Sequence, residues 1–216
     1  MQFVSELFYY VAIVVIGLLP IANPFSTAPV FLAVSSNLDA KSKYKLLKLT
    51  CIYMFCILIV FLLAGALILS FFGISVSALR IAGGLIITVL GFRMLFPSKS
   101  TEHETSHITT YEQAKGLAFT PLAMPMLSGP GSIAVIISMA AEISEKQGFL
   151  VKTASYFVVA LGILLTVIIC WLVLRSSTKV IKILGPTGID ALTRIMGFIL
   201  ICIGVEFTAS GIKGFF

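Results

Sequence analysis

Two proline-containing stretches carry polar and helix-breaking residues inside long hydrophobic segments. These residues are Asn23, Pro24, Ser26 and Thr27 in the first stretch, and Ser128, Gly129, Pro130, Gly131 and Ser132 in the second. Asn-Pro and Gly-Pro are typical of the N-cap and first position of a helix, because Asn accepts a backbone N–H and Pro donates none. A helix start inside a membrane presents free N–H groups to an anion such as a carboxylate. Backbone carbonyls freed at the same break suit a cation or an ammonium group. We therefore predict that these nine residues bind a substrate.

An internal repeat relates the two stretches. Three proline pairs share one offset of 101 residues, and six of the 17 positions from 20 to 36 are identical at that offset. The pairs are Pro20 with Pro121, Pro24 with Pro125, and Pro29 with Pro130. Broken hydrophobic segments at corresponding positions of two halves indicate the binding site of a secondary transporter. The alternative is a pair of ordinary proline kinks, which are common in membrane helices.

The composition is that of an integral membrane protein. Of the 216 residues, 59% are hydrophobic and 11% are charged, whereas soluble domains have about 25% charged residues. The apolar runs are long and continuous, which predicts helices rather than the alternating strands of a barrel. The net charge of +6 is explained by membrane topology, so no nucleic-acid partner is predicted.

Six apolar segments can be delimited, at about 5–36, 46–71, 79–96, 116–141, 151–174 and 191–212. The first would be about 48 Å long as a straight helix, which exceeds a hydrocarbon core of about 30 Å, so it must break at its prolines. The repeat continues as Arg-Ile-x-Gly at Arg80 and again at Arg194. We predict an all-α membrane protein of six transmembrane helices. They form two inverted three-helix repeats, 1–97 and 115–216, joined by a polar loop at 98–114, and the first and fourth helices are broken. If the broken segments are re-entrant hairpins, the repeats are parallel instead.

Three charged residues in the predicted spans are candidates for a coupling or structural role. Arg80 and Arg194 lie at span ends, where each could brace its own three-helix unit or contact substrate. Glu206 lies deeper in the last span, where a carboxyl group could couple proton movement or pair with a cation. The alternative is a solvated position, because Glu206 is within about two turns of the span end. H⁺ or Na⁺ is the coupling ion we consider, and no other cofactor is predicted.

One segment matches a zinc-protease motif. His103-Glu104-Thr105-Ser106-His107 has the HExxH pattern, which on a helix directs both His side chains at one metal and uses the Glu as base. Here the pattern falls in the polar loop, and the chain has no third His. We interpret the match as coincidental and predict neither a metal site nor an enzyme. A membrane metalloprotease and a scaffold without a substrate are the alternative hypotheses.

Seven motifs spread over nearly the whole chain resemble those of a known family. They are Leu18-Leu19-Pro20-Ile21-Ala22-Asn23-Pro24, Phe72-Gly73-Ile74-Ser75, Leu79-Arg80-Ile81-Ala82-Gly83-Gly84, Gly91-Phe92-Arg93-Met94-Leu95-Phe96-Pro97, Pro121-Leu122-Ala123-Met124-Pro125, Gly129-Pro130-Gly131 and Arg194-Ile195-Met196-Gly197-Phe198. The chain resembles the MarC family of bacterial inner-membrane proteins. This resemblance implies six membrane helices and a location in the inner (plasma) membrane.

Relatives of the SnatA type transport small neutral amino acids such as glycine and alanine. The resemblance therefore implies a secondary transporter of such amino acids, or of related small metabolites, that works by alternating access. The expected partners are a small-molecule substrate and the lipid bilayer. A homo-oligomer is left open.

The distribution of basic residues predicts the orientation in the membrane. The loops after the first, third and fifth segments hold 10 Lys and Arg residues, and the opposite side holds 3. Loops rich in Lys and Arg stay in the cytoplasm, so both termini are predicted to be extracytoplasmic. A reporter that is active only in the cytoplasm should be silent when it is fused to Phe216. Full activity of that fusion would contradict the orientation.

Overall fold

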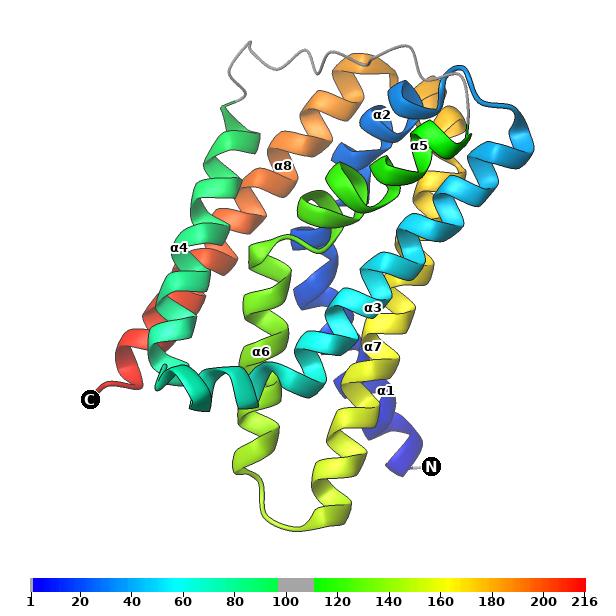
Figure 1. Ribbon diagram of the computed structural model, residues 1–216. Coiled ribbons are helices and arrows are strands. Elements are labelled where there is room, and N and C mark those ends of the chain that lie inside the picture. The colour runs from blue at the N-terminus through cyan, green and yellow to red at the C-terminus, as the bar shows by residue number, and fades with distance from the viewer. Residues whose placement is uncertain (1, 97–110) are drawn as a thin grey trace.

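The computed structural model describes residues 2–96 and 111–216, and within these residues all regular structure is helical (Figure 1). The elements are α1 (Gln2–Ala22), α2 (Pro24–Ser35), α3 (Ala40–Phe72), α4 (Val76–Leu95), α5 (Tyr111–Leu117), a wide-turned helical segment η1 (Ala118–Leu127), α6 (Pro130–Glu145), α7 (Phe149–Arg175) and α8 (Ser177–Lys213). Most of the predicted polar loop, including the HExxH match at 103–107, lies outside the described residues.

Four helices are long and apolar enough to cross a membrane: α3, α4, α7 and residues Thr187–Lys213 of α8. Two further pairs pass the same test together but are bent, by 48° between Leu7–Ala22 and Pro24–Ser35 and by 65° between Ala114–Leu127 and Pro130–Glu145. Figure 1 shows each bent pair running from one end of the molecule to the other. The chain therefore has six spans when each bent pair counts as one.

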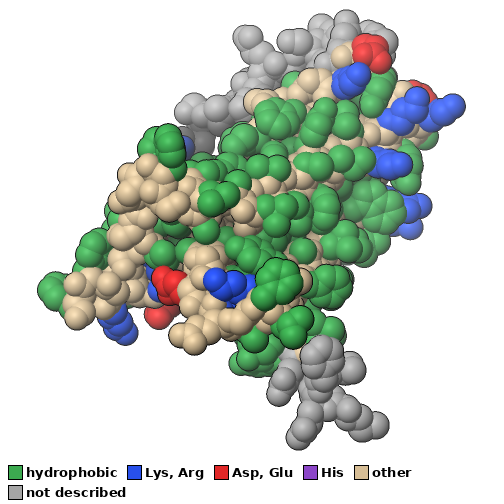
Figure 2. All heavy atoms as spheres, turned by 60° about the horizontal axis from the view of Figure 1, so that its bottom comes forward, with side chains coloured by type: hydrophobic (Ala, Val, Ile, Leu, Met, Phe, Trp, Pro, Cys, Tyr) green, Lys and Arg blue, Asp and Glu red, His purple; other side chains and the backbone are tan. Residues whose placement is uncertain are grey.

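The outer surface suits a lipid environment. Figure 2 shows hydrophobic side chains over most of the visible face, whereas Lys and Arg side chains lie toward its ends. Many large apolar side chains on the helices are exposed, among them Leu67 on α3 and Phe157 on α7. Both chain termini lie toward the same end of the molecule in Figure 1.

The break between α1 and α2 has a local cause in two residues. Asn23 adopts a left-handed backbone conformation, with φ 36° and ψ 69°, which Asn tolerates better than most residues. Pro24 follows at the first position of α2 and has no N–H, so the carbonyl of Pro20 lacks its helical donor. The predicted N-cap role of Asn23 is confirmed, because its side chain accepts a hydrogen bond from the Ser26 N–H at 3.3 Å.

The second break is longer than predicted. Thr120 and Met124 are extended, with φ −121° and ψ 121° and with φ −129° and ψ 123°. Each of them precedes a proline, whose ring disfavours the helical conformation of the residue before it. The chain then leaves η1 and restarts at Gly129, the N-cap of α6, with Pro130 at its first turn. The predicted break at 128–131 is therefore confirmed, but the irregular region begins several residues earlier.

The two breaks correspond only in part. At the offset of 101 residues, Met124 aligns with Asn23, and both are non-helical residues before a proline. Pro130 aligns with Pro29, which lies inside α2 without interrupting it. The second half of the chain therefore contains an additional break at Gly129 that the first half lacks.

The basic stretch at 175–188 is mostly helical, which corrects its prediction as a loop. α8 begins at Ser177, immediately after α7 ends. It is interrupted only at Gly185, which has φ 66° and ψ 175°. A Gly-Pro pair is typical of a turn, but Gly185 and Pro186 form a kink within α8.

α4 and α8 pack against each other through small residues spaced seven apart. They are Ser77, Gly84 and Gly91 on α4, facing Gly211, Gly204 and Gly197 on α8. A Cβ built on Gly84 would lie 2.5 Å from the carbonyl oxygen of Gly204, and one on Gly91 would lie 2.7 Å from that of Gly197. Such distances require backbone-to-backbone contact, which small residues allow in membrane helices. The pairing order makes the two helices antiparallel, as Figure 1 shows.

Replacing Gly204 with Ala should therefore destabilise the protein, because the new methyl group would lie 2.6 Å from the Gly84 carbonyl oxygen. Overpacking of this kind costs about 1–3 kcal/mol. Gly17 is the matched control: it lies in α1, and nothing lies within 4 Å of its Cβ position. Gly17→Ala should leave thermal unfolding in detergent unchanged or raise its midpoint, since Ala favours helix. Equal midpoints for Gly204→Ala and the wild type would contradict this packing.

Candidate functional site

The structure brings the two breaks together in the interior. A Cβ built on Gly131, in the first turn of α6, would lie 3.1 Å from Cγ2 of Ile21 and 2.9 Å from Cγ1 of Ile87. Ile21 is two residues before Asn23, and Ile87 lies on α4. The Asn23 side chain also reaches α4, where its Nδ2 lies 3.6 Å from Sδ of Met94. The end of α1 and the start of α6 therefore meet beside α4, which Asn23 also contacts.

The start of α2 is capped by its own residues. The Asn23 side-chain oxygen accepts the Ser26 N–H, and the Asn23 carbonyl accepts the hydroxyls of Ser26 and Thr27 at 3.1 Å and 3.2 Å. These predicted site residues therefore satisfy one another. The Asn23 amide nitrogen differs, because its partner is the Met94 thioether, which is a weak acceptor. Asn23 is 3% exposed, so this amide is a buried side-chain group of the first break that retains capacity for a ligand.

The start of α6 is open. Gly129 has no side chain with which to cap the helix, and Pro130 has no N–H. The N–H of Ile133 bonds to the Gly129 carbonyl at 3.1 Å. The N–H groups of Gly131 and Ser132 precede it in the first turn and have no intrahelical acceptor. The first turn of α6 therefore begins with two uncapped N–H groups, whereas the Asn23 side chain caps the corresponding third position of α2.

Ser132 adds a further unused group at this point. Its side chain is 1% exposed, and its Oγ is the one buried side-chain polar atom of the described residues without a hydrogen-bond partner. Leaving a buried polar group unpaired costs about 1–3 kcal/mol. The nearby Ser128 differs, since its hydroxyl donates to the Met54 carbonyl at 3.5 Å. The start of α6 therefore offers two backbone N–H groups and one hydroxyl to a ligand.

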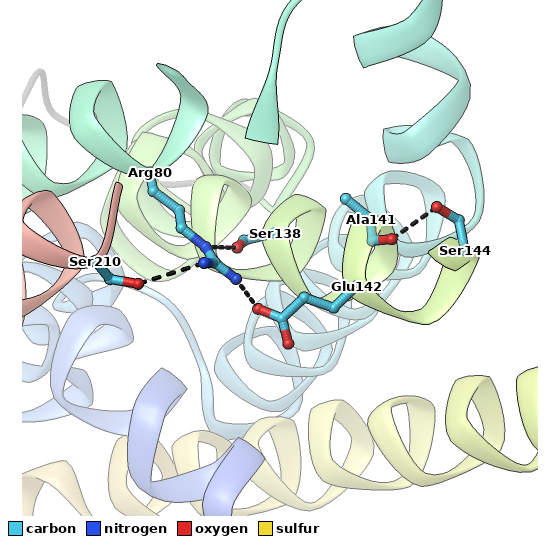
Figure 3. A network of polar contacts seen from close by, with 6 residues as sticks. All are labelled: Arg80, Ser138, Ala141, Glu142, Ser144 and Ser210. Carbon is cyan, nitrogen blue, oxygen red and sulfur yellow. Dashed lines mark hydrogen bonds and ion pairs between the residues drawn. The ribbon is translucent and has the colours of Figure 1, made fainter. Parts of the chain in front are cut away.

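Arg80 lies away from the breaks and joins three helices (Figure 3). From α4, its Nε donates to Ser138 Oγ on α6 at 3.0 Å, and its Nη1 donates to Ser210 Oγ on α8 at 3.3 Å. Its Nη2 forms an ion pair with the Glu142 carboxylate. The partners belong to the second predicted repeat, so Arg80 does not brace its own unit as expected. It is seven residues from Ile87, which is about 10 Å along a helix.

The two charged residues predicted in α8 also lie apart from the breaks. Arg194 Nε bonds to Asp190 Oδ2 at 3.2 Å, one turn away in the same helix, and both side chains are about half exposed. Glu206 is exposed on the outer surface of α8. Arg80 and Arg194 match in the sequence repeat, but their contacts differ. Among the residues that the structure describes, no three His, Cys, Asp or Glu side chains are close enough to hold a metal ion.

Several contact residues were not predicted from the sequence. Ile87 and Met94 are seven apart on α4 and face the breaks, but apolar residues at this spacing occur throughout a membrane protein. Glu142 lies just beyond the apolar segment predicted at 116–141, whereas α6 continues to Glu145. Ser138 and Glu142 are four apart and so share one helical face, a signal that could have indicated their common partner.

The geometry defines a multi-pass helical membrane protein whose two broken spans meet in its interior. The family model described as MarC family integral membrane protein matches residues 8–216. The inner membrane protein MarC of Escherichia coli strain K12 is 38% identical over 224 aligned residues, which cover 96% of each chain. The Shigella flexneri protein of the same name gives the same values. No solved structure matches the chain. The chain belongs to the MarC family and is a multi-pass protein of the inner membrane.

Two substitutions at Asn23 separate its backbone role from its side-chain role. Asn23→Gly should cost only a few tenths of a kcal/mol, because Gly adopts positive φ freely and is an acceptable N-cap. Asn23→Ala should cost roughly 1.5–4 kcal/mol, since it loses the cap and forces a methyl group into a left-handed conformation. Thermal unfolding of the two purified variants in detergent measures the difference. Equal stability of the two variants would show that the left-handed break is not needed.

Proposed function

We propose that this chain is a secondary transporter that moves small neutral amino acids such as glycine and alanine, or related small metabolites, across the bacterial inner membrane by alternating access. The observation that carries the proposal is the unpartnered, buried Ser132 hydroxyl at the uncapped start of α6. Unused donors in a protein interior favour a site that a ligand completes.

The substrate carboxylate is assigned to α6. Its acceptor oxygens can take the N–H groups of Gly131 and Ser132 and the Ser132 hydroxyl, at the positive end of the α6 dipole. The start of α2 is less suited, because Asn23 already caps it.

The substrate ammonium group is assigned to the end of α1. Pro24 leaves the Pro20 carbonyl without a helical donor, and the C-terminal end of a helix carries the negative end of its dipole. The contact between Ile21 and Gly131 brings this end of α1 beside the start of α6. A zwitterion can therefore bridge a negative helix end and a positive one.

The surroundings favour a small substrate without net charge. Ile21 and Ile87 both lie in contact range of the Gly131 position, so they leave little room beside the carboxylate for a large side chain. The buried polar side chains at the breaks are those of Asn23, Thr27, Ser128 and Ser132, and all four are neutral. A buried charge without a partner is costly, which disfavours substrates that carry an additional charge.

Alternating access is supported by the arrangement of the spans. With each bent pair counted as one span, each half of the chain has three spans, and we propose that the second half is inverted relative to the first. The antiparallel packing of α4 on α8 agrees with that relation. Inverted repeats commonly supply the two symmetry-related states of a transporter. We expect an H⁺ or Na⁺ gradient to drive the cycle.

Uptake of labelled alanine and glycine into proteoliposomes tests the proposal. Ser132→Ala should raise KM by roughly tenfold or more, because a hydrogen bond to a charged group contributes about 1.5–3 kcal/mol. The same change should leave thermal stability unchanged or higher, since it removes an unpaired buried hydroxyl. Ser36→Ala, at an exposed position after α2, is the matched control and should transport normally. Equal KM values for Ser132→Ala and the wild type would contradict this site, and the absence of uptake by the wild type under any ion gradient would contradict the function.

A further inference from the structure

α4 and α6 meet along a line of small residues that runs outward from the breaks. Ile87 lies against Gly131 at its inner end, and a Cβ built on Gly83 would lie 2.5 Å from Cβ of Ala134 in its middle. Arg80 bonds to Ser138 and pairs with Glu142 at its outer end. We call this contact line, from Ile87 and Gly131 to Arg80 and Glu142, the α4–α6 seam.

The seam joins a buried site to the surface. Its inner end is the first turn of α6, where the Ser132 hydroxyl is buried without a partner. At its outer end, the side chain of Arg80 is 22% exposed and that of Glu142 is 55% exposed. Gly131 and Glu142 are eleven residues apart, which corresponds to about 16 Å of helix and to about half of a 30 Å hydrocarbon core. The seam therefore covers the distance from the middle of the membrane to the surface near both termini (Figure 1).

We propose that the α4–α6 seam is the path by which substrate moves between Ser132 and the membrane face that bears the termini, and that the Arg80–Glu142 ion pair is the gate of this path. The inference rests on the proposed transport function. It assigns one route and one gate to that function.

The contacts of α4 with α8 and with α6 differ, and the contact with α6 is the one that can separate more readily. Toward α8, backbones touch at Gly84 and Gly91, so separation would lose a long close-packed interface. Toward α6, each contact involves a side chain, as at Ala134 against the Gly83 backbone, at Arg80, and where Leu79 packs in one apolar cluster with Ile137 and Ala141. An ion pair between partly exposed groups contributes about 0–1 kcal/mol, so opening it costs little.

The polar groups at the outer end also suit a zwitterion in transit. Figure 3 shows the Arg80 side chain reaching from α4 to Ser138, Glu142 and Ser210. Once the ion pair opens, the guanidinium can attract a substrate carboxylate and the Glu142 carboxylate can attract its ammonium group. The hydrogen bond to Ser210 would keep Arg80 attached to α8 while α6 moves.

A reversible cross-link across the gate distinguishes a moving gate from a static brace. Arg80→Cys and Glu142→Cys are combined in the full chain, with Cys51, Cys56, Cys170 and Cys202 replaced by Ala. The purified double variant is joined with a short bifunctional thiol reagent that a reductant cleaves. A covalent link preserves a brace but jams a gate, so alanine uptake should fall at least about tenfold, as expected when a required opening step is blocked. The reductant should restore uptake.

The ion pair between Asp190 and Arg194 provides the matched control. Both residues lie in α8, so Asp190→Cys and Arg194→Cys joined by the same reagent should not change uptake. Unchanged uptake after complete linking of positions 80 and 142 would overturn the gate. Failure of the unmodified chain to take up any neutral amino acid would instead overturn the transport function, and the seam proposal with it.

Cysteine labelling provides a second test that does not depend on the double variant. Ser138→Cys in the cysteine-free chain should react slowly with a membrane-impermeant thiol reagent, because Ser138 is 2% exposed beneath the ion pair. Adding Glu142→Gln removes the ion pair and should accelerate labelling at least about threefold, since the open seam becomes more populated. Equal labelling rates with Glu142 and with Glu142→Gln would overturn the gate.

Discussion

A proline inside a membrane span removes a backbone N–H where no lipid group can replace it. The two breaks in this interior differ in how the chain compensates for the interrupted backbone hydrogen bonding. At Pro24, the Asn23 side chain caps the new helix. At Pro130, Gly129 cannot do so, and the donors of the first turn of α6 and of Ser132 stay unused. The same constraint therefore gives one helix start with a side-chain cap, at α2, and one without, at α6.

The uncapped start of α6 is held in place by helix contacts of two kinds. α4 and α8 touch backbone to backbone at regularly spaced glycines, and such close packing resists separation. α6 rests on this pair through Gly83 and through the contacts of Arg80. α6 therefore carries the unused donors at one end and a solvent-exposed ion pair at the other. The proposed binding site and the proposed gate therefore lie at opposite ends of the same helix.

Much of this arrangement can be predicted from the sequence, because strong local signals determine it. Proline spacing located both breaks, and Asn23 and Gly129 are N-caps as expected. Long-range contacts could not be derived in the same way. The sequence repeat matches Arg80 with Arg194, but their contacts in the folded protein differ. Arg80 connects three helices, whereas Arg194 pairs with a residue one turn away in its own helix. The helix at 177–184 was missed because its basic residues are equally typical of a loop.

The central claim is that the uncapped start of α6 receives the substrate carboxylate. The most direct measurement is an experimental structure of the purified protein with alanine bound. We expect the carboxylate oxygens of alanine to lie within about 2.7–3.2 Å of the N–H groups of Gly131 and Ser132 and of the Ser132 hydroxyl. Alanine bound elsewhere, with the Ser132 hydroxyl still unpartnered, would contradict the account.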